Sequence, residues 1–203
     1  MAKRKSIPPS VTRDLKNKIK ASSQFRAAAQ KAGEEAFLSV KSDFFNEFEE
    51  HPITQEIEAG PTATNLSGTL NGYGNLFSFI GFNSGDNPVG QLRSILKSMM
   101  RMSKVKVRKG AETKVFFEVS VPDIKVITAG TPMPWESGRS WVRGVERGIS
   151  GFGYYMSTQE KRFSRSGAGI QADSRLRAGA YVPRKYMSQM LRNLNRNLRK
   201  LVR

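Results

Sequence analysis

Cysteine is absent from this chain of 203 residues, and histidine occurs once. Without cysteine the chain forms no disulfide and offers no thiolate to a metal, which suits a reducing compartment. No stretch reaches the roughly 18 apolar residues that a membrane helix needs, so no membrane span is expected. The basic N-terminus has no apolar run behind it, so no secretory signal is predicted and synthesis in a cytoplasm is expected.

Apolar and acidic residues are both scarce. Hydrophobic residues make up 38% of the chain, which allows only a modest core. Lys and Arg total 34 against 17 Asp and Glu, a formal net charge of +17. A charge of this size attracts polyanions such as nucleic acid or acidic protein surfaces. We therefore expect part of the chain to be ordered by partners and not by its own packing.

Signs of catalysis are weak. The single histidine, His51, precedes Pro52 at a predicted helix end, where a helix cap or a packed ring is more typical than a catalytic base. Asp43, Glu47 and Glu50 share one helix face, and a metal-dependent nuclease would place Mg²⁺ there. Like charges on one face more often indicate a solvated or interfacial surface. Neither a G-x-S-x-G elbow nor a P-loop pattern occurs, so no enzyme activity, metal or cofactor is predicted.

Helical periodicity dominates both ends of the chain. A long helix is predicted from Ser10 to about Glu50, with room for a bend at Ser22-Ser23, and a short one over 52–59. Asn87-Pro88 starts another helix, and Pro183 is predicted to open the last. The apolar faces of the first and last helices are predicted to pack in an oligomer or against a partner: Phe37, Val40, Phe44, Phe48, Met187, Met190, Leu191, Leu194 and Leu198.

The centre of the chain alternates between strand and loop patterns. Residues 76–82 are predicted to form a buried strand or a loop under the core. Residues 104–121 predict a β-hairpin with one buried face and a turn at Gly110-Ala111. Residues 122–138 have no assignment, 140–148 fit a short helix or a strand, and 149–181 predict a long loop.

These elements together predict an α+β fold with a long N-terminal helix, a small antiparallel sheet and a C-terminal amphipathic helix. We divide the chain into a basic tail and helical arm over 1–50 and a single α+β domain over 51–203. The long loop at about 149–181 belongs to that domain.

Charge is segregated along the sequence. Residues 34–58 hold eight of the 17 acids, residues 93–114 hold eight bases and one acid, and the last twenty residues hold seven bases and no acid. Opposite patches fit a head-to-tail interface that closes into a ring. The alternative is that the acidic stretch folds back on the chain's own basic hairpin, and the sequence leaves both open.

Cations near aromatic residues mark the long loop as a contact for DNA or a partner loop. The candidate contacts are Lys161, Arg162, Arg165, Arg175 and Arg177. These cations and the net positive charge fit one candidate function, that of a cytoplasmic protein that binds nucleic acid without sequence preference.

A block of sequence resembles virion structural proteins of tailed phages. It comprises His-Pro-Ile-Thr-Gln-Glu-Ile-Glu-Ala-Gly-Pro at 51–61, Asn-Leu-Ser-Gly-Thr-Leu at 65–70 and Gly-Asn-Leu-Phe-Ser-Phe-Ile-Gly-Phe at 74–82. The wider layout is similar to neck and tail-completion proteins of the minor tail protein Z type. The resemblance implies a virion component without catalytic residues that forms a ring of identical subunits at the head–tail junction. Its implied partners are the head-closure connector, the tail terminator or tail tube, and packaged DNA nearby.

Overall fold

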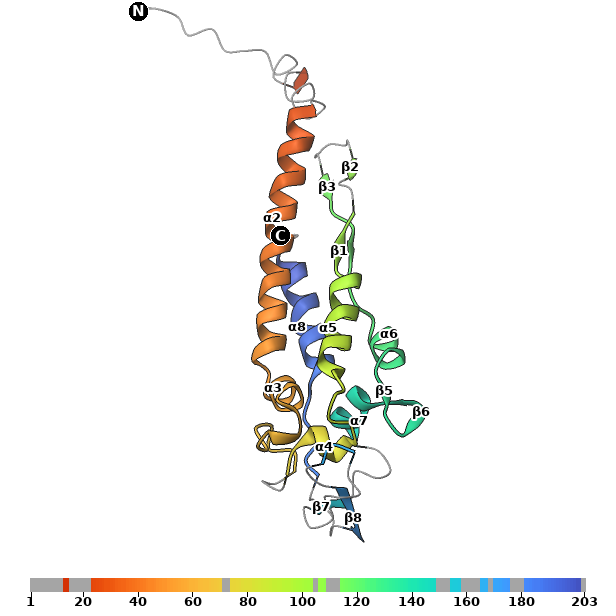
Figure 1. Ribbon diagram of the computed structural model, residues 1–203. Coiled ribbons are helices and arrows are strands. Elements are labelled where there is room, and N and C mark those ends of the chain that lie inside the picture. The colour runs from red at the N-terminus through yellow and green to blue at the C-terminus, as the bar shows by residue number, and fades with distance from the viewer. Residues whose placement is uncertain are drawn as a thin grey trace, which may run out of the picture. The chain divides into compact units, whose positions relative to one another are not determined.

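The computed structural model describes residues 13–14, 23–70, 74–103, 106–108, 114–148, 154–157, 165–167, 170–175 and 181–201. Helices and short antiparallel strand pairs alternate along these ranges (Figure 1), which confirms the predicted α+β class. The chain divides into two compact units, residues 1–39 with 101–120 and residues 40–100 with 121–203. The hairpin region thus groups with residues 1–39. The division predicted at residue 50 stays a prediction.

The long N-terminal helix, α2 (Ser23–Glu50), begins in the first unit and ends in the second. Its end at Glu50 agrees with the prediction, because Pro52 disfavours helical geometry at the residue before it. Residues 13–14 are also helical, and the remaining residues of 10–22 lie outside the described ranges.

The predicted hairpin is confirmed in the first unit. Strand β1 (Arg101–Met102) pairs with β4 (Val119–Ser120), and β2 (Lys106–Arg108) pairs with β3 (Lys114–Phe116), both antiparallel. The predicted turn at 110–111 lies outside the described residues.

The predicted burial of one hairpin face is wrong. Val115 and Val119 are only partly covered, and Phe117 is 39% exposed. Among the described residues of its unit the ribbon contacts helix α2, where the Phe117 ring occupies the space that a side chain at Gly33 would need. One helix cannot cover a whole face of the ribbon.

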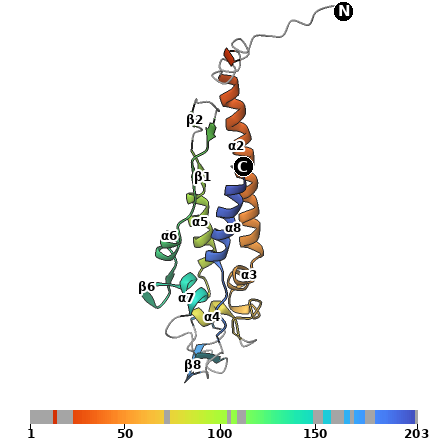
Figure 2. The same ribbon diagram turned by 180° about the vertical axis from the view of Figure 1, so that it is seen from behind.

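The second unit is mainly helical. In both views the last part of α2 lies beside α5 and α8, while α3, α4 and α7 gather at one end of this group (Figures 1 and 2). The helices are α3 (Pro52–Glu58), the 3-10 turn η1 (Gly60–Thr62), α4 (Leu76–Ile80), α5 (Pro88–Met99), α6 (Ile124–Ala129), α7 (Trp141–Arg147) and α8 (Met187–Lys200).

An aromatic cluster marks the core of this unit. The Tyr186 ring stacks on Phe48 at 6.4 Å between centroids and lies 6.4 Å from the ring of Trp141. All three side chains are at most 1% exposed. The Tyr186 hydroxyl bonds with that of Thr54 at 2.7 Å, so its polar end is satisfied inside the core.

Residues 76–82 are largely buried as predicted, but residues 76–80 form helix α4, where a strand or a loop was predicted. Asn75 caps α4 by accepting the Ser78 N–H at 2.9 Å. Gly81, at φ +89°, ends the helix in the left-handed conformation. Short apolar runs do not separate strand from buried helix, and here the two caps decide.

The last helix also differs from its prediction, because it begins at Met187 and not at Pro183. Glu146 of α7 accepts the N–H groups of Tyr186 at 3.0 Å and Ser188 at 2.6 Å. The start of α8 is therefore set by a side chain from a distant segment.

The segment over 149–181, predicted as one long loop, contains a strand pair. Strands β7 (Tyr154–Ser157) and β8 (Ile170–Arg175) are antiparallel, as are β5 (Pro132–Met133) and β6 (Glu136–Ser140) nearer the N-terminus. The Ser166 hydroxyl donates to that of Ser78 at 2.6 Å, which ties the segment to α4. Across the described ranges the strands form separate two-stranded pairs and not one small sheet.

None of the helices in the described ranges combines the length and the apolar character needed to cross a bilayer.

Candidate functional site

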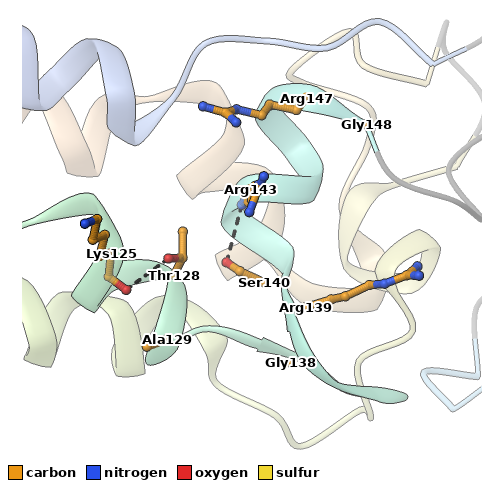
Figure 3. A pocket seen from close by; sticks show the side chains of 9 residues that line it. All are labelled: Lys125, Thr128, Ala129, Gly138, Arg139, Ser140, Arg143, Arg147 and Gly148. Carbon is orange, nitrogen blue, oxygen red and sulfur yellow. Dashed lines mark hydrogen bonds between the residues drawn. The ribbon is translucent and has the colours of Figure 1, made fainter.

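A cationic pocket of about 570 Å³ lies between α6, β6 and α7 in the second unit (Figure 3). Four of its lining side chains are cationic and none is acidic. Its lining consists of Lys125, Thr128, Ala129, Gly138, Arg139, Ser140, Arg143, Arg147 and Gly148.

Two helix caps position the cations of this pocket. Asp123 caps α6 by accepting the Lys125 N–H at 2.9 Å, and Ser140 caps α7 by accepting the Arg143 N–H at 3.3 Å. Arg143 and Arg147 lie one turn apart on α7, so their side chains share a helix face. The pocket is thus built on two capped helices and a strand.

The acids of the same segment are engaged elsewhere. Residues 121–148 contain the acids Asp123, Glu136 and Glu146. Asp123 and Glu146 cap helices, and Glu136 pairs with Arg139 at 3.0 Å. Lys125, Arg143 and Arg147 form no ion pair with any described residue. Figure 3 shows Arg139 pointing away from Lys125, which leaves these three as the free cations of the pocket.

A second cationic surface lies on α8. A hollow of about 700 Å³ is lined by Arg192, Asn195, Arg196, Arg199 and Lys200, all of them exposed. Within the described ranges no carboxylate pairs with these cations. The nearest acidic link is indirect, because Asn193 accepts from Arg196 at 2.6 Å and donates to Glu47 at 2.7 Å.

Much of the acidic segment is used inside the chain. Arg93 of α5 donates from Nε and Nη2 to both oxygens of Glu49 at 2.7 Å and from Nη2 to Glu58 at 2.6 Å. Hydrogen bonds from Arg93 hold the pKa of Glu49 below its usual range, and those carboxylates raise the pKa of Arg93. The alternative in which the acidic stretch folds back on the chain's own bases thus occurs in part, with Arg93 of α5 as the base.

His51 has the structural role that was predicted. Its Nδ1 accepts the Ile53 N–H at 3.2 Å and caps α3, and its ring lies 4.9 Å from that of Tyr186. Burial lowers the pKa of His51, so the neutral ring is favoured.

A Mg²⁺ site at Asp43, Glu47 and Glu50, the alternative interpretation of that helix face, has no supporting geometry in the described residues. No three His, Cys, Asp or Glu side chains within the described residues form a group that could hold a metal ion. Glu47 is engaged with Asn193, while Asp43 and Glu50 are exposed.

The residues predicted to pack between subunits are buried inside the single chain. Eight of the nine are at most 9% exposed: Phe37, Val40, Phe44, Phe48, Met187, Met190, Leu191 and Leu194. Leu198 is partly exposed. Packing against another subunit stays a prediction, and for the eight it requires their present surroundings to open.

Two of the predicted loop contacts lie in the described ranges. Arg165 is exposed and donates to the Pro134 carbonyl at 3.1 Å, and Arg175 lies in β8. Lys161, Arg162 and Arg177 lie outside the described residues.

The cationic pocket was missed from sequence because residues 122–138 had no assignment. A usable signal was present, since Arg143 and Arg147 share a face once 141–147 is a helix. The proximity of Lys125 depends on how α6 packs beside α7, which no local pattern encodes.

A scan against protein-family models finds no match to this chain, and searches of curated proteins and of solved structures find none either.

Proposed function

We propose that this protein is a structural component of a tailed-phage neck, joining head and tail as a ring of identical subunits around the DNA channel. The observation that carries the proposal is the imbalance between engaged acids and free cations. Acidic side chains of α2 and α3 are held by Arg93, while the cations of the α7 pocket and of α8 lack acidic partners in the described residues.

Free cations on two surfaces favour a protein that works by contact with anionic neighbours. Exposed lysine and arginine add little to the stability of a monomer. They speed and orient association with surfaces of opposite charge. In a neck, the anionic neighbours would be packaged DNA and acidic faces of the head-closure connector, the tail terminator or the tail tube.

The block that resembles phage virion proteins forms a buried part of the second unit. Ile53, Ile57, Leu76 and Ile80 are at most 1% exposed. A carboxylate inside the block, Glu56, organises the backbone that follows it. The resemblance therefore rests on residues that specify the fold, which supports kinship in structure and carries no catalytic role.

Two measurements test the proposal: the protein composition of purified virions and the mass of the assembled oligomer. Mass spectrometry of gradient-purified virions from the source of the gene should detect the chain at ring stoichiometry. Native mass spectrometry of the purified chain with its purified neck partners should give a closed oligomer. A chain that is missing from virions, or that stays monomeric with those partners, would contradict the proposal.

A second candidate is a cytoplasmic protein that binds nucleic acid without sequence preference. The same free cations favour it, because phosphate contacts need only lysine and arginine. This candidate predicts tight binding by the isolated monomer and no incorporation into particles. The virion measurement therefore separates the two.

A further inference from the structure

We infer that the pocket between α6 and α7 binds the phosphodiester backbone of a nucleic acid through Lys125, Arg143 and Arg147. This inference goes beyond the proposed assembly role and does not depend on it, because it concerns the isolated chain.

The local electrostatics of the pocket favour an anionic ligand. All four cationic residues that line the pocket are exposed, and no acid lines it. Each acid of residues 121–148 is occupied by a helix end or by Arg139. The three remaining cations form no ion pair with a described carboxylate, so their N–H donors are available to a ligand.

The geometry of the donor groups favours phosphate oxygens as acceptors. Two of them are guanidinium groups, whose fork of N–H donors matches two oxygens of a phosphate. Arg143 and Arg147 extend from neighbouring turns of α7, while Lys125 comes from α6 (Figure 3). Cations distributed over two helices suit a chain of phosphates better than one small anion.

The solvent exposure of these cations favours a polymer over a single ion. Exposed cations are screened by salt, so a single phosphate ion gains little there. A polymer gains more, because each phosphate that is neutralised releases condensed counterions. The pocket is therefore suited to a polyanion and not to free phosphate.

The other lining residues favour a duplex over a membrane surface or unpaired bases. Besides its cations the pocket offers Thr128, Ser140, two glycines and Ala129, and no large apolar or aromatic side chain. A membrane surface would need apolar side chains to insert, and unpaired bases would need aromatic rings for stacking. The lining therefore favours backbone contact with a duplex, without sequence readout.

The test is fluorescence anisotropy of a labelled DNA duplex with the full chain, over a series of NaCl concentrations. The variant R143Q/R147Q removes two pocket charges. The matched control K97Q/K185Q removes the same charge from exposed lysines of the same unit that line neither cationic surface. Circular dichroism and thermal unfolding confirm that each variant folds.

We expect R143Q/R147Q to weaken duplex binding by about tenfold. The slope of log K against log salt should fall by about 1.8, which corresponds to the loss of two phosphate contacts. The control should bind within about threefold of the wild type. R143K/R147K keeps the charges and should restore most of the slope. Duplexes of unrelated sequence should bind alike.

Equal weakening by the control would overturn the inference, because binding would then follow net charge and not the pocket. Displacement of the duplex by millimolar inorganic phosphate at constant ionic strength would assign the pocket to free phosphate instead. Tighter binding to phosphatidylserine vesicles than to the duplex would assign it to membranes. None of these results bears on virion incorporation, so failure here and failure of the neck proposal are distinguishable.

Discussion

The carboxylate of Glu56 in α3 accepts the backbone N–H of Leu76, the first residue of α4, at 2.8 Å. It also accepts the Ser67 N–H at 2.7 Å and the Asn65 side-chain amide at 3.3 Å. Glu56 is fully buried, and no cation among the described residues pairs with it. Backbone and amide donors thus take the place of a counter-ion, and they fix the path of the chain between α3 and α4.

Replacement of Glu56 should strongly destabilise the second unit. Glu56→Ala leaves two buried N–H donors without an acceptor, at about 1–3 kcal/mol each. Glu56→Gln keeps one carbonyl oxygen and should lose less. Urea unfolding checks the order wild type, Gln, Ala. The exposed Glu50→Ala is the control and should change the free energy of unfolding by less than about 0.5 kcal/mol.

Arg93→Ala should weaken the junction of α2, α3 and α5. The guanidinium binds Glu49 through two bonds and Glu58 through one, and lies 5.9 Å over the Phe48 ring. Both carboxylates are at least 40% exposed, so solvent screening limits the loss to about 1 kcal/mol. Arg93→Lys keeps the charge without the fork and should recover only part of it.

The Arg93 pairs also predict a pH effect. The pKa of Glu49 is lowered by its hydrogen bonds to Arg93, so this stabilisation is full above pH 4.5 and is lost as pH falls through the folded-state pKa. Urea unfolding of the wild type and of Arg93→Ala should converge in that acidic range. A difference that stays constant with pH would contradict this role.

His51 predicts a second pH effect, in a higher window. Burial lowers its pKa below 6.5, although a hydrogen bond to the Lys185 backbone and the nearby Glu47 and Glu146 oppose the shift. The unfolded chain binds a proton more readily, so stability should fall as pH drops from 6.5 toward the folded-state pKa. His51→Asn keeps an N-cap without the titration. Its unfolding free energy should vary less between pH 7 and about 5.5, and an equal pH slope would contradict the assignment.

The sequence encodes the helical elements of this fold better than its irregular parts. The ends of α2 and α3 and the Asn87 cap of α5 follow from Pro52, Gly60 and Asn87, which act locally. The start of α8 could not be predicted, because it depends on Glu146, forty residues earlier than Tyr186. Local signals thus place an element, and tertiary contacts set its limits.

The same distinction holds for the candidate site. The segregation of charge was visible in the sequence, but which acids remain free was not. Glu49, Glu56 and Glu58 belong to one acidic run, yet two of them bind Arg93 and the third binds backbone amides. Only the packing shows that Glu49 and Glu58 are held by Arg93, while the three free cations of the pocket form no ion pair in the described chain.

Leu194→Ala separates a core role from an interface role for the apolar stripe of α8. Leu194 is 1% exposed within the single chain, so its truncation should cost about 2–5 kcal/mol of unfolding free energy through lost burial and the cavity left behind. A core residue lowers stability equally at every protein concentration, whereas an interface residue acts only where subunits associate. Urea unfolding at two widely separated concentrations distinguishes these cases, with exposed Arg199→Ala as the control. We expect the full loss at both concentrations. A loss confined to the higher one would move this stripe from the core to the contact between subunits.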